Sequence, residues 1–473
     1  MKSILTAFLL ITFTLSYAQN AKNLYATHCA GCHGANLQGA TSGPALLKNA
    51  WKNNAGKKSI ARAIHKGVPG TTMVAWENTL SSQQIDDLTD FILTAQNTKQ
   101  GNAIDSATVF INTQAYTLKI EKVVTSGLKT PWGIEFVNED SALVTEKTGG
   151  LRWLVKGKLV TEPIKGLPVA YLGTSTAGLM DIALDPDYAK NGWVYLGVSK
   201  SVADSQDKKA LALTKIIRGK VRENRWVEEQ TLFEVPDSLK VVDGNRWGCR
   251  FLFDKAGHLF FTIGDMGRAM DSQDLGKATG KVFRINNDGN IPEDNPFVNQ
   301  KGALPAIYSL GNRNVQGIDQ HPVTGEIWMT EHGPKGGDEL NIMKKGANYG
   351  WPVITYGIDY DGSIVSEITE KEGMEQPIIY WTPSIAVSAI AFCASPRFPA
   401  WKNNLLVGAL GFQELRRLVI VDDRVLAQEL LFKGMGRVRD IKFGPDGALY
   451  ILINNPDEIL RITPSPTPSA RRD

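Results

Sequence analysis

A strand, a turn that contains glycine and an acidic residue, and a second strand recur along the larger, C-terminal part of this chain. The clearest copies are residues 253–262 (FDKAGHLFFT) and 443–452 (FGPDGALYIL), and this pattern is typical of a β-hairpin. Looser copies occupy residues 136–146, 184–198, 321–330 and 401–409. Six copies over about 350 residues predict four-stranded blades, so we expect an all-β six-bladed β-propeller over residues 118–463. A pair of β-sandwiches is the alternative, and it explains the repeated turn less well.

The N-terminus has the pattern of a secretory signal. Lys2 is followed by an apolar stretch over residues 4–15 and by the small residue Ala18. This stretch is shorter than the roughly 20 residues that a membrane-spanning helix needs, so we expect residues 1–18 to be cleaved. An uncleaved anchor is the alternative. The mature protein is therefore expected to be periplasmic or secreted and not membrane-spanning, with residues 464–473 as a disordered, Pro-rich tail.

The charge pattern favours small-molecule chemistry. The formal net charge is +3 over 473 residues, and the chain has no run of Lys and Arg. We therefore expect a small-molecule substrate and no nucleic-acid partner.

Cys29, Cys32 and His33 form the CxxCH pattern by which haem c is attached. Two thiols one helical turn apart can both add to the haem vinyl groups, while the adjacent imidazole reaches the iron. A redox disulfide and half of a zinc site are the alternatives, but His28 and His65 do not supply the second ligand pair that zinc would need. The pattern therefore predicts covalent haem c, with His33 as an iron ligand.

Met73 is the predicted second axial ligand of the haem iron. It is the only methionine between the signal and residue 180, and a thioether ligand raises the haem potential enough for it to accept electrons from an organic cofactor. Residues 20–97 resemble a small all-α class I cytochrome c. Residues 98–117 lose the helical period, and we interpret them as a linker.

Two cysteines lie in the predicted propeller. Cys249 and Cys393 are far apart in sequence, and they are compatible with either a disulfide or two buried thiols.

Three groups of polar residues adjoin the repeated turns. The loop over residues 330–341 contains Gly333, Pro334 and neighbouring carboxylates, which are oxygen donors that suit Ca²⁺, although a polar turn is the alternative. Arg313 and Asn314 can offer charge-assisted hydrogen bonds to a carboxylate or quinone oxygen. Arg437 and Arg439 point to the same side of a strand, since side chains alternate with period two. Together these residues favour an anionic ligand over solvated surface charge.

The chain resembles the soluble glucose/sorbosone dehydrogenase family over about residues 118–463. The most specific stretches are residues 178–186, 264–265, 289–296 and 348–352. Members of that family bind pyrroloquinoline quinone (PQQ) and Ca²⁺ on a six-bladed propeller. The resemblance implies that the carbonyls of Gly333 and Pro334 bind Ca²⁺. It also implies that Arg313 and Asn314 contact PQQ near its reactive carbonyl, and that Arg437 and Arg439 pair with its carboxylates.

The sequence departs from the family at the catalytic base. The family has a histidine four residues before the arginine that matches Arg250, whereas this chain has Arg246. Arginine stays protonated and cannot act as a general base at ordinary pH. Asp243, Asp265 or His332 could supply a base if the loop is rearranged. Alternatively, Arg246 binds an anionic substrate or the cofactor.

These patterns predict a periplasmic quinohaemoprotein. The propeller would oxidise a sugar or a related alcohol or aldehyde with PQQ, with Arg246 and Arg313 at the reacting centre. The fused haem would take the electrons and pass them to a downstream acceptor such as a cytochrome or an oxidase. The alternatives are a non-catalytic ligand-binding propeller with an electron-transfer cytochrome, and a metal-dependent hydrolase, which leaves the haem unexplained.

Overall fold

A computed structural model of the chain divides it into two compact units, Met1–Ser106 and Ala107–Asp473. The structure describes residues 21–34, 37, 46, 57–68, 73–97, 108–173, 176–242 and 244–466. The predicted signal over residues 1–18 lies outside these ranges. Among the described residues, no helix is long and apolar enough to cross a membrane.

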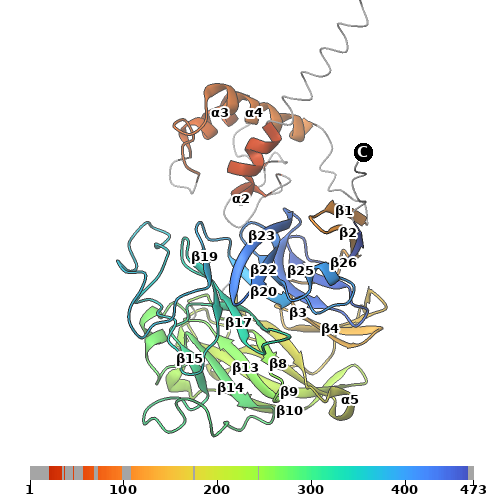
Figure 1. Ribbon diagram of the computed structural model, residues 1–473, viewed down its shortest axis with the longest axis vertical. Helices are drawn as coiled ribbons and strands as arrows, with labels where there is room; N and C mark the ends of the chain where they lie inside the picture. Colours follow the sequence, from red (N-terminus) through yellow and green to blue (C-terminus); the bar gives the residue numbers. More distant parts are fainter. Residues whose placement is uncertain are drawn as a thin grey trace, which may run out of the picture. The chain divides into compact units, whose positions relative to one another are not determined.

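The first unit is all-α, as predicted. Its helices are residues 21–28, α2 (Ala30–His33), α3 (Lys57–Lys66) and α4 (Ser82–Asn97) (Figure 1). Helix α4 begins at a capping box, in which Ser81 Oγ accepts from the Gln84 N–H at 3.3 Å and Gln84 Oε1 accepts from the Ser81 N–H at 2.9 Å. The helices bury their apolar faces in one cluster that contains Ile60, Ile85 and Leu88.

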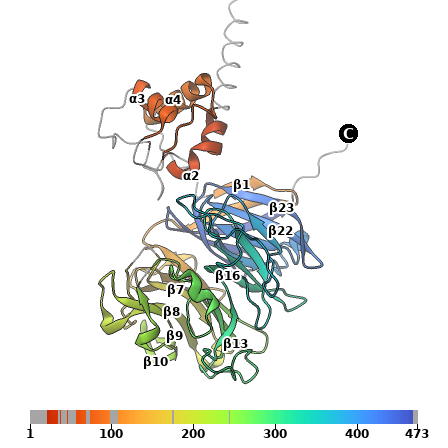
Figure 2. The same ribbon diagram turned by 90° about the vertical axis from the view of Figure 1, so that its left-hand side faces the viewer.

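The second unit contains six antiparallel sheets, one for each blade of the predicted six-bladed propeller. Figure 2 shows β7, β8, β9 and β10 following one another across the second blade. The strands of the first three blades are β3 (Pro131–Asn138), β4 (Ser141–Glu146), β5 (Gly150–Val155), β6 (Lys158–Leu159); β7 (Leu179–Leu184), β8 (Trp193–Ser201), β9 (Leu211–Arg222), β10 (Arg225–Phe233), with β11 (Val241–Val242) beside β9; and β12 (Phe251–Phe253), β13 (His258–Ile263), β14 (Lys281–Asn286), β15 (Ile307–Leu310). Those of the last three are β16 (Val315–Gln320), β17 (Ile327–Glu331), β18 (Asp338–Ile342), β19 (Ile379–Trp381); β20 (Val387–Phe392), β21 (Leu405–Ala409), β22 (Glu414–Val421), β23 (Arg424–Lys433); and β24 (Arg437–Phe443), β25 (Leu449–Asn454), β26 (Glu458–Pro466), β2 (Tyr116–Val124), β1 (Thr108–Asn112).

Each copy of the repeated unit forms the connection between the first and second strands of one blade. The copy at residues 253–262 spans the end of β12 and most of β13, and the copy at 443–452 joins β24 to β25. The four looser copies occupy the same place in the other blades. The sequence repeat therefore corresponds to one hairpin per blade.

Neighbouring blades are joined by side-chain hydrogen bonds that run once around the ring. In each case a hydroxyl or amide of one blade donates to a backbone carbonyl of the next, at 2.6 to 3.4 Å. The pairs are Thr145–Met180, Thr214–Trp247, Thr262–Val315, Thr330–Ser388, Ser388–Val438 and Asn454–Pro131. Because these groups are buried, each bond also provides a partner for a polar atom whose burial without a hydrogen bond would cost free energy.

The ring closes where the beginning and the end of the second unit share a blade. Figure 1 shows β1 and β2, in orange, beside β26, in blue, and Ile120 of β2 pairs with Ile462 of β26. Two predicted boundaries are therefore corrected. Residues 108–117 are not linker, since they form β1 and the start of β2. The tail begins later than residue 464, since β26 continues to Pro466 alongside β2, where β25 has ended and an edge position tolerates proline.

The two cysteines of the propeller are both buried free thiols. Cys249 lies in a core cluster around Trp247 and Phe261, whereas Cys393 lies in another around Trp401. The structure thus gives two buried thiols and no disulfide between them.

We expect Ile120→Ala to destabilise the whole propeller by about 2–5 kcal/mol, because it leaves a cavity in the closing blade. Ile120 is fully buried, whereas Phe110 of β1 is 63% exposed. Phe110→Ala is therefore the control and should change the unfolding free energy by less than about 0.5 kcal/mol. Urea unfolding followed by tryptophan fluorescence measures both. An unchanged transition in Ile120→Ala would mean that β2 does not close the ring.

Candidate functional site

The N-terminal ends of the blades' first strands position the site. Five of these six strands change register with their neighbour there, namely β3, β7, β16, β20 and β24. Such bulges leave a residue out of the ladder and re-aim its side chain, which is why they recur next to functional sites. Gln316 and Arg439 occupy two of these bulges.

Arg313 and Asn314 precede β16 and are buried. Arg313 donates from Nη1 to the carbonyls of Gly333 at 2.7 Å and His332 at 3.3 Å, but among the described residues its buried Nε has no hydrogen-bond partner. Burial lowers the pKa of Arg313, and the nearby charge of Arg246 lowers it further. Asn314 Oδ1 accepts from the Gly248 N–H at 3.1 Å.

Arg437 and Arg439 lie on β24, but a register shift at Arg439 interrupts the period-two alternation from which the sequence placed both side chains on one side. Arg439 donates to the amide oxygens of Gln316 at 3.1 Å and Asn454 at 3.3 Å. Arg437 is partly buried, and among the described residues no acceptor binds its side chain. Burial lowers the pKa of both, and in Arg439 the charge of Arg437 adds to this effect.

Arg313, Arg437 and Arg439 form what we call the arginine cradle. All three are among the charges that depress the pKa of His332, so they lie near one side chain. None of them has a carboxylate partner in the described part of the chain. Buried charges normally require compensation. The cradle therefore fits a ligand that carries several carboxylates, such as PQQ.

Arg246 is held by the carboxylate of Asp265. Its Nε donates to Asp265 Oδ1 at 2.6 Å, while Trp351 Nε1 donates to Asp265 Oδ2 at 2.9 Å. The Arg246 side chain is 27% exposed, whereas Asp265 is fully buried. Gly264 permits this approach, since a Cβ there would lie 1.9 Å from the Arg246 carbonyl oxygen. Arg246 thus presents a compensated cation to the site.

His332 and Asp265 are poorly suited to act as the general base. His332 is buried, and burial followed by the charge of Arg313 lowers its pKa to about 3, so it is a weak base near pH 7. Both oxygens of Asp265 are already bonded. Asp243 lies outside the described residues. Of these three residues, those that the structure describes are therefore not free bases matched to neutral pH.

The loop after β17 contains the predicted Ca²⁺ ligands, Gly333 and Pro334. The Gly333 N–H donates to Asp338 Oδ1 at 3.0 Å. The sequence did not single out Glu331 and Glu339, which lie directly opposite each other in the β17–β18 ladder. Burial raises the pKa of both, and the Glu331 charge raises that of Glu339 further. A hard cation would offset the energetic cost of burying these two carboxylates, so the loop's oxygen donors fit Ca²⁺. However, no three His, Cys, Asp or Glu side chains converge within the described residues.

The predicted haem residues gather in the first unit. Cys29 caps α2, His33 ends it, and the His33 N–H donates to the Cys29 carbonyl at 2.9 Å. Cys29 and His33 are buried, whereas Cys32 is exposed. Met73 packs against the same apolar cluster that contains Cys29. Cys29 and Met73 thus share one apolar cluster.

Two family models match the chain. The Glucose / Sorbosone dehydrogenase model matches residues 128–461, and the model of cbb3-type cytochrome c oxidase subunit III matches residues 17–92. An aldose sugar dehydrogenase of Escherichia coli, YliI, is 36% identical over 356 residues, which are 74% of this chain and 93% of the relative. Quinoprotein glucose dehydrogenase B of Acinetobacter calcoaceticus is 29% identical over 256 residues, 49% of this chain and 52% of the relative. The crystal structure of the apo-form of the soluble aldose sugar dehydrogenase from Escherichia coli is similar with a TM-score of 0.68 and 34% identity, covering 74% of this chain and all of that one.

We expect Met73→Ala to lower the haem reduction potential and to remove the visible absorption band of methionine-ligated ferric haem, because the thioether ligand is lost. Val74 is 61% exposed, so Val74→Ala is the matched control and should leave both unchanged. Redox titration and absorption spectroscopy measure these properties. Methionine ligation that persists in Met73→Ala would refute the assignment.

Proposed function

Because this chain belongs to the glucose/sorbosone dehydrogenase family and carries a fused cytochrome c domain, we propose that it is a PQQ-dependent sugar dehydrogenase. It oxidises a sugar or a related alcohol or aldehyde and passes the electrons to its own haem c. The secretory pattern of residues 1–18 supports a periplasmic location. A soluble cytochrome or an oxidase would then collect the electrons from the haem.

The observation that carries this proposal is the arginine cradle, which pairs with no carboxylate among the described residues. Arg437 and Arg439 would hold carboxylates of PQQ, and Arg313 with Asn314 would contact its quinone oxygen. The chemistry that bound PQQ supplies is the acceptance of two electrons from the carbon of a substrate hydroxyl. The carbonyls of Gly333 and Pro334, near Glu331 and Glu339, would hold Ca²⁺ as a Lewis acid. The quinoprotein relative from Acinetobacter calcoaceticus supports a quinone in this family.

The chain's own residues also constrain the reaction. Burial of the cradle excludes water and strengthens its hydrogen bonds to an anionic ligand. Arg246 would donate hydrogen bonds to a substrate or cofactor oxygen, since its charge is already compensated by Asp265. It cannot accept the proton of a substrate hydroxyl. The proton of a substrate hydroxyl must therefore go to another group or to water, and we expect turnover to be slow.

A second function is favoured by one observation, the Arg246–Asp265 pair. With the base position occupied by a fixed cation, the propeller could bind its ligand without turning it over. In that case the haem domain would serve electron transfer independently of the propeller.

Arg437→Gln should weaken PQQ binding about 10- to 100-fold, because it removes a charge-assisted hydrogen bond worth about 1.5–3 kcal/mol. Arg424 lies exposed on β23, so Arg424→Gln is a control that loses the same charge elsewhere. Equilibrium titration of the haem-loaded apo-protein with PQQ in excess Ca²⁺ measures the affinity. Equal affinities in the two variants would rule out the cradle as the cofactor site.

Arg246→His should raise kcat for aldose oxidation by about 10²- to 10⁴-fold, because Asp265 can orient an imidazole that accepts the proton. Arg246→Lys is the control, since it keeps the charge and adds no matched base. Stopped-flow measurement of haem reduction, after loading with PQQ and Ca²⁺, reports turnover with a panel of aldoses and alcohols. If the wild-type protein binds PQQ but no substrate reduces the haem, the non-catalytic function stands instead.

A further inference from the structure

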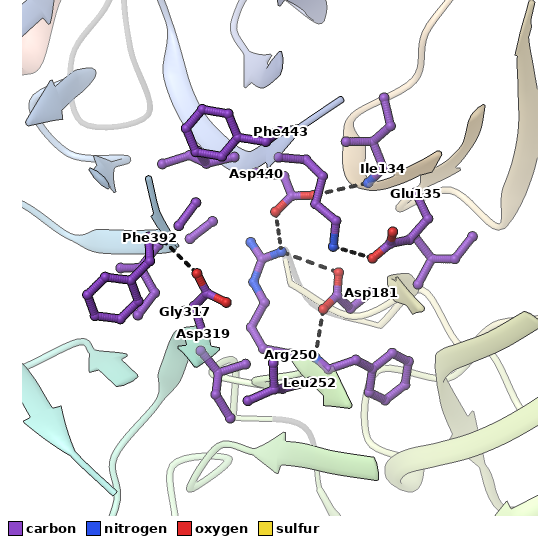
Figure 3. Close-up of a pocket in the computed structure, with 18 residues that line it drawn as sticks. Ile134, Glu135, Asp181, Arg250, Leu252, Gly317, Asp319, Phe392, Asp440 and Phe443 are labelled. Atoms are coloured by element: carbon purple, nitrogen blue, oxygen red, sulfur yellow. Dashed lines mark hydrogen bonds and ion pairs between the residues drawn. The ribbon is translucent and has the colours of Figure 1, made fainter. Parts of the chain in front are cut away.

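Arg250 lies on the propeller axis, immediately before β12. Its side chain is 3% exposed and borders a cavity of about 250 Å³ that the first strands of all six blades line. Figure 3 shows the guanidinium at the centre of this ring, facing Asp181 and Asp440. Because one side of the guanidinium faces a cavity, packing alone does not define its position, and its hydrogen bonds must.

These hydrogen bonds reach three other blades. Arg250 Nη1 donates to Asp181 Oδ1 at 3.3 Å and to Asp440 Oδ1 at 3.1 Å (Figure 3). Its Nε donates to the Gln316 carbonyl at 2.7 Å, and its Nη2 donates to the Arg439 carbonyl. One side chain of the third blade therefore binds the second, fourth and sixth blades.

The two carbonyls belong to the bulges of β16 and β24. A bulged residue is left out of the regular ladder, so its carbonyl is available to another donor. The side chains of the same two residues, Gln316 and Arg439, meet at the cradle, where Arg439 Nη1 donates to Gln316 Oε1 at 3.1 Å. Gln316 Nε2 donates in turn to the Gly248 carbonyl at 2.7 Å. Arg250 thus holds the backbone of Arg439, a cradle residue, and of Gln316, which accepts from it.

The carboxylates around Arg250 are themselves fixed. Asp181 Oδ2 accepts from the Phe251 N–H at 2.8 Å, and Asp440 Oδ2 accepts from the Ile134 N–H at 3.0 Å. Burial raises the pKa of Asp181, and Arg250 opposes this shift. A buried ion pair is tolerated only when its geometry is nearly complete, which leaves Arg250 little freedom to move.

We propose that Arg250 is a positioning residue for the arginine cradle. Through the Gln316 and Arg439 carbonyls it sets the Arg439 guanidinium where a cofactor carboxylate would bind. The inference rests on the proposed function, but it concerns how this chain builds the site and not which substrate the site takes.

The test compares Arg250→Lys and Arg250→Gln with a matched variant that borders the same cavity. Lysine keeps the charge between Asp181 and Asp440 but cannot donate to both carbonyls as a guanidinium does. Asp319→Asn is the control, because Asp319 accepts from the N–H groups of Phe392 and Gln320, and among the described residues no hydrogen bond joins it to the cradle. Titration of the haem-loaded apo-proteins with PQQ in excess Ca²⁺ should show affinity at least about 10-fold weaker in both Arg250 variants, and within about 2-fold of wild type in the control.

A double-mutant cycle separates positioning from general stability. If Arg250 acts through Arg439, Arg250→Lys should weaken PQQ binding in the wild-type background but by less than 2-fold in an Arg439→Gln background. A purely structural role would lower the melting temperature and give the same fold-loss in both backgrounds, and that result would overturn the proposal. Retention of full affinity by Arg250→Lys would overturn it as well. Arg250→Lys decides the question if Arg250→Gln does not fold.

A crystal structure of Arg250→Lys gives a readout that does not depend on the cofactor. The expected result is a displaced Arg439 guanidinium that no longer donates to Gln316. An unmoved Arg439 would refute the positioning role. If the wild-type protein binds no PQQ, the proposed function fails, and the position of Arg439 in this variant still decides whether Arg250 sets the cradle.

Discussion

The ion cluster around Arg250 is the interaction on which the architecture of the site depends. A propeller has no core at its axis, because its blades pack face to face and their first strands leave a channel. Here the channel is crossed by one guanidinium that binds carboxylates and carbonyls of three other blades. Removing such a charge from water is costly, so the cluster is stable only when every partner is present. The relative positions of these blades, and of the side chains on their bulges, follow from that requirement.

The arginines of the candidate site differ from Arg250 in how their positive charge is compensated. Arg313, Arg437 and Arg439 are largely buried and have no carboxylate partner among the described residues, whereas Arg246 is paired with Asp265. The three cradle arginines can therefore attract an anion, whereas the charge of Arg246 is already neutralised by Asp265. A site with this distribution fits a polycarboxylate cofactor, even though Arg246 stands where the family has its histidine base. The proposed binding and the proposed turnover therefore depend on different residues.

The fused cytochrome supplies an electron acceptor for the proposed oxidation. Oxidation of a substrate hydroxyl releases two electrons, whereas a haem accepts one electron at a time. A tethered haem speeds each transfer, because the tether raises the effective concentration of the acceptor. The two units are compact by themselves, and they belong to an oxidoreductase that couples a sugar dehydrogenase-like propeller to electron transfer.

The sequence by itself determined whatever depends on residues close together along the chain. The spacing of Cys29, Cys32 and His33 follows from one turn of helix, and the six repeated hairpins follow from period-two strands around a glycine turn.

Only the tertiary structure decided which distant residues meet. Ile120 pairs with Ile462, and Arg250 contacts Asp440, because closure of the ring brings together segments separated by hundreds of residues. The bulges at Gln316 and Arg439, the opposition of Glu331 and Glu339, and the separation of Cys249 from Cys393 likewise depend on strand register and blade order. A local pattern cannot encode these features, because their energies arise from burial and from partners that the chain acquires only when the propeller has closed.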